Sequence, residues 1–187
     1  MLSYMKVASG NEFLNPQKIL HEVGLTYGHR IADLGCGGAG YFVLQASKIV
    51  GDRGIVYGVD VLKHALSGLK SKLELEGTQN VILVWSNLEM YGAAKQIKDD
   101  SLDIALLVNT LFQSHNKAAI IKEAVRIISP GGKLLVIDWK TGGLSFGPNE
   151  KDLVSPREIQ QHGEANGLTL EKAYDPGQYH FGLLFKK

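Results

Sequence analysis

The residues whose types and spacing most clearly indicate a chemical role lie in the glycine-rich segment 31–40, which has the sequence IADLGCGGAG. A strand there runs directly into a turn that opens a helix. Gly35, Gly37 and Gly40 permit positive φ angles and let a ligand contact the backbone, while the amides of the helix face any anionic part of that ligand. Asp33, just before the glycines, would face a cationic group. The segment therefore predicts a site for a small charged ligand.

A second carboxylate, Asp60, ends the next apolar strand-like run, 20 residues beyond Gly40. This is the spacing expected for a side chain that binds ribose hydroxyls. Both carboxylates follow buried strands, so they should meet at the carboxyl edge of a parallel sheet, near its topological switch point. Together they predict an adenosine site.

The glycine pattern also fits G-x-G-x-x-G, so an NAD(P)-binding oxidoreductase is an alternative. Asp33 argues against it, because a carboxylate two residues before the first glycine would repel a pyrophosphate. The chain also leaves no residues for the separate substrate domain that most dehydrogenases carry, and we find no tyrosine and lysine at helical spacing for hydride transfer. These features favour a methyl donor.

Candidates for the acceptor side lie after the fourth and fifth predicted strands. His115 could bind the acceptor or act as a base, although an exposed histidine before a helix is an equally good interpretation. Asp138 ends the fifth strand beside Trp139, which places it at the catalytic rim. Tyr179 and His180 fit the packed surface of a strand better than a catalytic role. The glycine-rich segment 141–149 could form a lid, with Phe146 as an apolar contact.

The elements that must position these residues alternate along the chain. Apolar, β-branched runs predict five strands at 30–34, 54–59, 81–85, 102–109 and 133–139. Helical periodicity and capping signals predict helices at 16–23, 41–50, 63–76, 117–128 and 156–166. Asn15 and Pro16 should open the first of these helices, and Ser155 with Glu158 should form a capping box for the last. The run 130–132 should stop the helix before it.

Two further strand-like runs, 168–174 and 179–185, are joined by only four residues, which is too short for a parallel crossover. They predict an antiparallel hairpin. The whole pattern is α/β: a doubly wound, mostly parallel seven-stranded sheet in the order 3-2-1-4-5-7-6 with a C-terminal antiparallel hairpin. We expect one domain over 1–187, with 1–25 as an N-terminal cap region.

At this point the sequence resembles the class I S-adenosylmethionine-dependent methyltransferases over nearly the whole chain. The segments that carry the resemblance are DLGCG at 33–37, the acidic residue at 60, SNLE at 86–89, LDIALLVN at 102–109 and ISPGGKLLV at 128–136. The resemblance is greatest to the small-molecule branch that includes quinone-ring methyltransferases. It implies a Rossmann-like fold, S-adenosylmethionine as the cofactor and methyl transfer to a small or medium organic acceptor.

The resemblance also implies which residues hold the donor. It places Asp33, Gly35 and Gly37 at the methionine end and Asp60 on the ribose. The remaining positions are Val61 and Leu62 on adenine, Asn87 and Leu88 at its edge, and Asn109 in the segment that resembles the fourth motif. One position departs from the family pattern, because the third glycine is replaced by Ala39.

Composition sets wider limits. Twenty basic and 19 acidic side chains are interspersed and give a net charge of +1, so no charged block indicates nucleic acid. No apolar run approaches the roughly 20 residues that span a bilayer, and residues 1–10 do not resemble a secretion signal, so we expect a cytoplasmic protein. The single cysteine, Cys36, provides no metal-ligand spacing, and no metal is predicted. A non-catalytic protein that binds an adenosyl ligand stays open as a further alternative.

Overall fold

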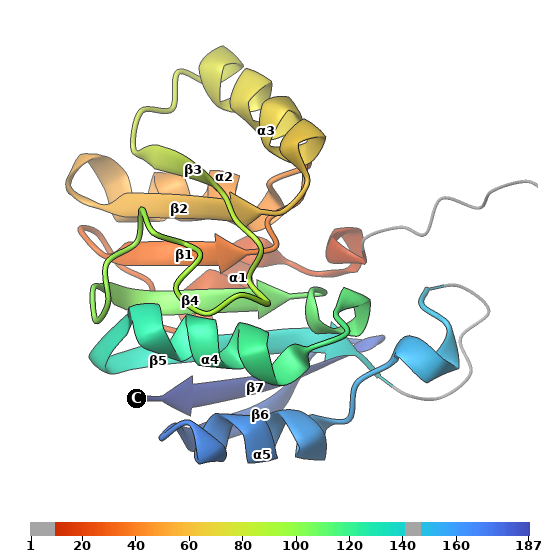
Figure 1. The fold of residues 1–187 in the computed structure, drawn as a ribbon. Coiled ribbons are helices and arrows are strands. Elements are labelled where there is room, and N and C mark those ends of the chain that lie inside the picture. The colour runs from red at the N-terminus through yellow and green to blue at the C-terminus, as the bar shows by residue number, and fades with distance from the viewer. Residues whose placement is uncertain (1–9, 141–146) are drawn as a thin grey trace, which may run out of the picture.

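Seven strands form one mixed sheet in the computed structural model, which describes residues 10–140 and 147–187 (Figure 1). The strands are β1 (Arg30–Leu34), β2 (Ile55–Asp60), β3 (Val81–Trp85), β4 (Leu102–Val108), β5 (Ile128–Trp139), β6 (Thr169–Gly177) and β7 (His180–Lys186). Their order is β3-β2-β1-β4-β5-β7-β6, and β7 runs antiparallel to both of its neighbours. The predicted fold class and strand order are confirmed.

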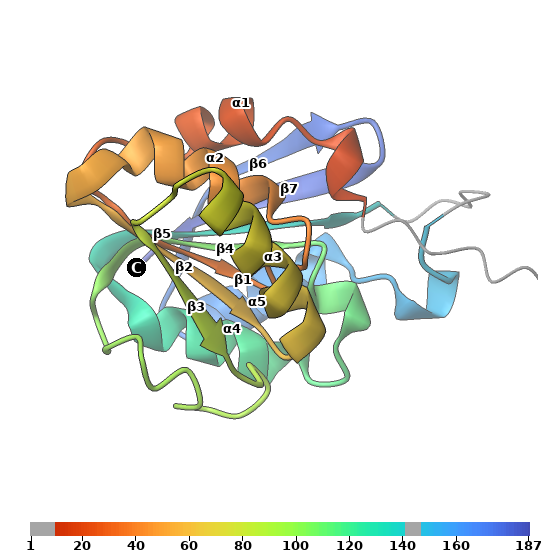
Figure 2. The ribbon, with the colours of Figure 1, turned by 90° about the horizontal axis from the view of Figure 1, so that it is seen from above.

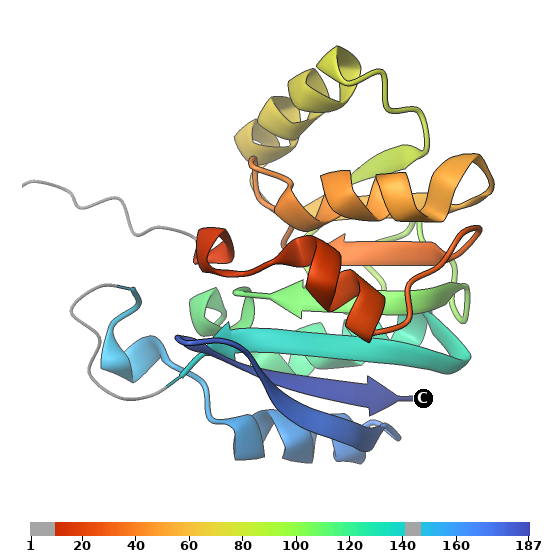
Figure 3. The same cartoon turned by 180° about the vertical axis from the view of Figure 1, so that it is seen from behind.

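Helices cover both faces of this sheet (Figure 2). The α-helices are α1 (Pro16–Glu22), α2 (Tyr41–Val50), α3 (Lys63–Leu75), α4 (Lys117–Ile127) and α5 (Pro156–Ala165). Short 3-10 turns are η1 (Asn11–Phe13), η2 (Gly51–Arg53), η3 (Leu111–Gln113) and η4 (Glu150–Asp152). Of these turns, η1, η3 and η4 lie at the edge where the parallel strands end (Figures 1 and 3).

The sheet separates two hydrophobic cores. On one face α1, α2 and α3 pack on the strands through side chains such as Ile19, Phe42 and Leu69. On the other face α4 and α5 pack on the strands through side chains such as Ile121 and Ile159. Both faces of the central strands are therefore buried, which is why these strands are continuous apolar runs rather than alternating ones.

Local sequence sets most helix starts. The Asn15 side chain accepts a hydrogen bond from the Lys18 amide at 3.0 Å, with proline at the first helical position, so the predicted cap of α1 is confirmed. Ser155 does precede α5, but its side chain makes no capping bond, and the predicted capping box is wrong. Glu158 instead lies 3.8 Å from His162, one turn further along.

The start of β5 differs from the prediction. Helix α4 ends at Ile127, but the run 130–132 lies inside the strand rather than in a loop. Gly131 has a φ of 83°, and the pairing of β5 with β4 shifts between Leu102 and Ile104. A Cβ at Gly132 would lie 2.9 Å from the Leu102 carbonyl oxygen. The glycines therefore form a β-bulge in which the two strands approach closely.

The terminal hairpin is tighter than predicted. Strand β6 continues through Pro176 to Gly177, which pairs with His180, so only two residues form the turn. Proline is tolerated there because β6 is an edge strand, and the register shifts between Tyr174 and Gly177.

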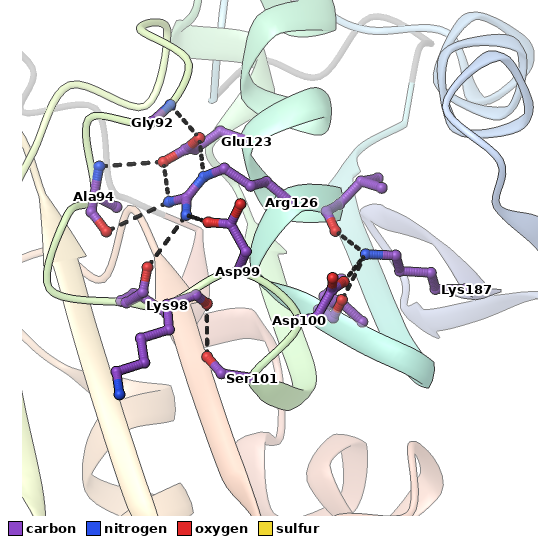
Figure 4. Close-up of polar contacts among 12 residues, drawn as sticks. Gly92, Ala94, Lys98, Asp99, Asp100, Ser101, Glu123, Arg126 and Lys187 are labelled. Carbon is purple, nitrogen blue, oxygen red and sulfur yellow. Dashed lines mark hydrogen bonds and ion pairs between the residues drawn. The ribbon is translucent and has the colours of Figure 1, made fainter.

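The long connection between β3 and β4 is held by an ion-pair cluster on α4 (Figure 4). The fully buried Glu123 accepts hydrogen bonds from the amides of Gly92 and Ala94 at 2.7 and 3.1 Å. Arg126 binds Glu123 at 2.7 Å and also contacts Asp99. This connection therefore has a fixed path without regular secondary structure.

Within the described residues, no helix is long and apolar enough to cross a membrane.

Candidate active site

The glycine loop after β1 adopts the conformation that its sequence predicts. Gly35, Gly37 and Gly40 have φ angles of 91°, 61° and 63°. A Cβ at Gly35 would lie 2.5 Å from Thr110 Oγ1, so only glycine fits there. At Gly37 nothing lies within 4 Å of such a Cβ, which leaves its backbone open to a ligand.

The departure at Ala39 leaves this loop intact. Ala39 has no positive φ angle, because the left-handed positions fall at Gly37 and Gly40 on either side. The Ala39 carbonyl accepts a hydrogen bond from Lys72 Nζ at 3.1 Å. Gly40 then caps α2, and a Cβ there would lie 2.3 Å from Leu69.

Asp60 joins the loop to the end of β2. Its carboxylate accepts hydrogen bonds from the Gly37 amide at 2.9 Å and the Leu62 amide at 2.8 Å. A carboxylate offers about four acceptor positions, so two stay available for hydroxyl donors. This arrangement suits the predicted contact with a ribose.

Asp33 is a buried carboxyl group, 4% exposed, whose side chain accepts no hydrogen bond within the described part of the chain. Burial, and secondarily the negative charge of Asp60, raises the pKa of Asp33 to about 7. A cationic group at this position would stabilise the ionised form. The site is therefore matched to a positively charged ligand moiety.

The residues predicted to meet adenine fall into two groups. Val61 and Leu62, directly after Asp60, are about half exposed at 52% and 50%. Their exposed apolar surface is suitable for packing against a flat ring. Asn87 is exposed, and its side chain accepts a hydrogen bond from the Glu89 amide. Leu88, however, is buried in the hydrophobic core, so only its backbone can meet a ligand.

Two residues of the same segment were missed as site residues. The Ser86 hydroxyl is buried and has no hydrogen-bond partner among the described residues, although the Ser86 amide binds the Asp60 carbonyl at 3.1 Å. Glu89 reaches across to the segment after β4, where it binds the Ser114 hydroxyl at 2.6 Å and the His115 amide at 3.1 Å. These hydrogen bonds lower the pKa of Glu89. Both residues belong to the segment 86–89 that suggested the adenine edge.

Asn109 lies at the end of β4 in a left-handed conformation, with a φ of 53°. Its Nδ2 donates to Asn11 Oδ1 at 2.8 Å, and its buried Oδ1 has no partner within the described residues. Thr110 follows and contacts Gly35, so Asn109 adjoins the glycine loop. Asn11 could not be predicted, because this contact joins residues 98 positions apart.

A cavity of about 650 Å³ lies beside this end of β4. The segments after β4 and β5 bound it. The described residues that line it are Phe112, Gln113, Ser114, His115, Lys117, Gly147, Pro148, Asn149, Lys151 and Asp152. Gln113 also donates to the Asn109 carbonyl at 2.8 Å, which connects the cavity wall to the donor side. The volume is in the range of sites for small molecules.

The two predicted catalytic residues lie in different environments. His115 is exposed and lines the cavity, so it has access to an acceptor. Asp138 is fully buried and accepts hydrogen bonds from the amides of Leu111, Phe112 and Trp139 at 3.1, 3.2 and 2.9 Å. Burial raises its pKa to about 7, although these amides act in the opposite direction. Asp138 therefore holds η3 in place, and its carboxylate does not line the cavity.

Trp139 connects several segments at the same edge. A Cβ at Gly10 would lie 2.3 Å from its ring, and one at Gly147 would lie 3.2 Å from it. The ring also packs against His180, with centroids 4.6 Å apart and the ring planes tilted by 37°. His180 is fully buried, and burial lowers its pKa to about 4. The predicted lid residues 141–146, with Phe146, lie outside the described residues, as do residues 1–9 of the N-terminal cap region.

These features together fit S-adenosylmethionine. Asp33 is a buried carboxyl group without a partner among the described residues, and Gly37 leaves space against its backbone. Val61 and Leu62 expose apolar surface directly after the carboxylate of Asp60. A doubly wound sheet with an antiparallel seventh strand and these two carboxylates defines the class I methyltransferases. Within that class, the chain belongs to the methyltransferase domain family, which it matches over residues 25–180.

Individual proteins that the chain resembles are also named as methyltransferases. The chain is 34% identical over 115 residues to the ubiquinone/menaquinone biosynthesis C-methyltransferase UbiE of Shewanella frigidimarina, covering 61% of this chain and 44% of the relative. The UbiE protein of Shewanella sp. (strain W3-18-1) is 30% identical over 142 residues, covering 75% and 55%. The chain thus spans about half the length of these relatives. A SAM-dependent methyltransferase structure from Aquifex aeolicus is 27% identical with a TM-score of 0.85, covering 95% of this chain and 92% of that one.

Proposed function

We propose that the protein transfers a methyl group from S-adenosylmethionine to a small organic acceptor. The observation that carries this proposal is the continuity of the two sites: Thr110 contacts the glycine loop, and Gln113 binds Asn109 and lines the cavity. Family membership supports methyl transfer over the alternative of an NAD(P)-dependent oxidoreductase.

Residues of four segments would hold the donor. Asp60 would bind the ribose hydroxyls, and Val61 with Leu62 would pack on adenine. Asn87 and the backbone of Leu88 would meet the adenine edge. The methionine end would lie on the loop of Gly35 and Gly37, with Asp33 at its ammonium and Asn109 Oδ1 beside it. All of these groups lie at the carboxyl ends of the strands, as ligand sites do in doubly wound sheets.

When bound, S-adenosylmethionine supplies a methyl group already activated by its sulfonium. The protein then has to align an acceptor with that group and exclude water. We propose the cavity beside η3 as the acceptor site. His115 would bind the acceptor or take its proton, and Asp138 would act as a positioning residue, because its carboxylate fixes the Leu111 and Phe112 amides.

Calorimetric titration with S-adenosylhomocysteine tests the donor site. We expect Asp60→Asn to weaken binding by about 1–3 kcal/mol, the cost of removing a charged hydrogen-bond acceptor. Asp52→Asn is the matched control: Asp52 precedes β2, at the opposite end of the same strand, and should bind like the wild type. Binding of NAD in place of S-adenosylhomocysteine would overturn the proposal in favour of the oxidoreductase.

Transfer of a labelled methyl group to a panel of small acceptors then tests catalysis. Turnover by any of them, reduced by His115→Ala, is the expected result. Donor binding without turnover on any acceptor would favour the non-catalytic alternative.

We further propose that the protein acts in the cytoplasm. This location is supported by Cys36, which is buried and free, as cysteines are in reducing compartments. A fluorescent fusion would show the location directly.

A further inference from the structure

Basic side chains outnumber acidic ones in the described lining of the cavity beside η3. Lys117, Lys151 and His115 are basic, whereas Asp152 is acidic and accepts a hydrogen bond from Asn149 at 3.2 Å. Glu89 is a further carboxylate nearby. It keeps its negative charge, but it lies outside the described lining and binds Ser114 and backbone amides. The described lining therefore presents two ammonium groups and one carboxylate.

The two lysines are available for a ligand. Within the described part of the chain, neither forms an ion pair, and the contact of Lys117 is a 3.4 Å hydrogen bond to the Ser114 carbonyl. The charge of Lys117 also acts on Asp138 and partly offsets the larger effect of burial, which raises the pKa of that carboxyl. Asp138 is buried behind η3, where three amides bind it. An anion in the cavity would thus meet two ammonium groups that form no ion pair within the described residues.

Apolar surface in this cavity is scarce. Among the described lining residues, only Phe112 and Pro148 offer it, whereas a long hydrocarbon substituent would need a continuous apolar wall. The lining therefore favours a compact, polar molecule that carries negative charge.

We propose that the methyl acceptor is a small organic anion, a carboxylate or a phosphate ester, whose anionic group binds Lys117 and Lys151. This inference rests on the proposed function, because it assigns the cavity to the acceptor. Lys117 lies at the start of α4 and Lys151 in η4, so the two lysines come from the two segments that bound the cavity. The rest of the acceptor then extends toward Gln113 and the donor side.

NMR titration of the labelled full chain, saturated with S-adenosylhomocysteine, tests this charge preference. The probes are benzoate, phenyl phosphate and the neutral isostere benzamide. We expect benzoate or phenyl phosphate to shift the amide signals of Gln113–Lys117 and Gly147–Asp152, with benzamide at least about tenfold weaker, as for the loss of one charge-assisted hydrogen bond. Comparison of the two anions distinguishes a carboxylate from a phosphate ester.

Substitutions of the two lysines test whether they are the groups that bind the anion. Lys117→Gln and Lys151→Gln should each weaken the anion about tenfold, and Lys117→Arg should retain it because the charge stays. Lys122→Gln, on the same helix but facing Tyr91, is the matched control and should bind like the wild type. Three outcomes would overturn the inference: benzamide binding as tightly as the anions, no binding of either anion, or wild-type anion affinity in both glutamine variants. Saturation by S-adenosylhomocysteine in the same sample tests the donor site separately, and the turnover assay tests the proposed function, so failure of the charge preference is distinguishable from failure of either.

Discussion

The ionisation of Asp33 should make both the stability of the protein and the affinity of the donor site depend on pH. Because burial raises its folded-state pKa from 3.8 to about 7, the folded protein binds more protons than the unfolded chain between these values. The free energy of unfolding therefore falls as pH rises through this window, by at most about 1.4 kcal/mol per pH unit for this group. Asp138 is raised to about 7 as well and contributes in the same direction.

We expect the ligand-free Asp33→Asn variant to lose part of this slope and to be more stable than the wild type at pH 8. Its affinity for S-adenosylhomocysteine should fall, and it should lose the rise in affinity that the wild type shows from pH 6 to 8, where the carboxyl ionises toward the ligand's ammonium. Chemical denaturation and calorimetry at each pH measure both effects. An Asp33→Asn variant with the wild-type pH profile of binding would contradict the assignment.

Residues of the candidate site differ in how well sequence could identify them. Asp33, the glycines and Asp60 are readable because each is fixed by a strand end and a short turn. Asn11 and Glu89 act through contacts with Asn109 and Ser114, which no local pattern encodes. For Asp138, sequence gives the correct edge of the sheet but not its burial, because that depends on how η3 folds over it.

At the scale of elements, the path of the β3–β4 connection depends on α4. Glu123 and Arg126 hold this connection from 92 to 99 (Figure 4). Its earlier part carries Asn87 and Leu88, which we propose meet the edge of adenine. The two buried side chains form a charged pair, so removing the charge of Glu123 leaves Arg126 with only the exposed carboxylate of Asp99.

We expect Glu123→Gln to lower the free energy of unfolding by about 3 kcal/mol. Because the connection loosens, affinity for S-adenosylhomocysteine should fall as well. Glu74→Gln is the control, since Glu74 forms an exposed pair with Lys70 on α3 and should change stability by less than about 0.5 kcal/mol. Glu123→Gln with wild-type stability would show that the cluster does not hold the connection.

Elements were predictable where periodicity and capping agree, as in α1 and the central strands. The exceptions are β5 and β6, where glycine and proline signal a break in most contexts. Here Gly131 forms a bulge and Pro176 lies on the edge strand, so pairing with neighbouring strands overrides the local signal.

For the whole molecule, strand order follows from the alternation of strands and helices together with the short hairpin link, which is why the topology was predictable. A cap over residues 1–25 was expected as well, but the contacts that hold the N-terminal segment were not predictable. Gly10 contacts both Trp139 and Asn109, so η1 covers the ends of β4 and β5.

We expect Gly10→Ala to displace η1. Its Cβ would lie 2.3 Å from the Trp139 ring, and its φ of 82° is unfavourable for alanine. Hydrogen exchange should show faster exchange in 11–14 with little change in the sheet. Gly24→Ala is the control, because Gly24 has a φ of 83° but nothing within 4 Å of a Cβ. Equal exchange in both variants would mean that the contact with Trp139 does not hold η1.

The two tryptophans also give the molecule separate optical reporters. Trp85 is 58% exposed and donates to the Val61 carbonyl, beside the proposed adenine position, whereas Trp139 is fully buried under η1. Trp85→Phe would leave emission from Trp139 alone, and Trp139→Phe the converse. Stopped-flow fluorescence could then time the arrival of the adenine ring and the movement of η1 separately, without an attached dye.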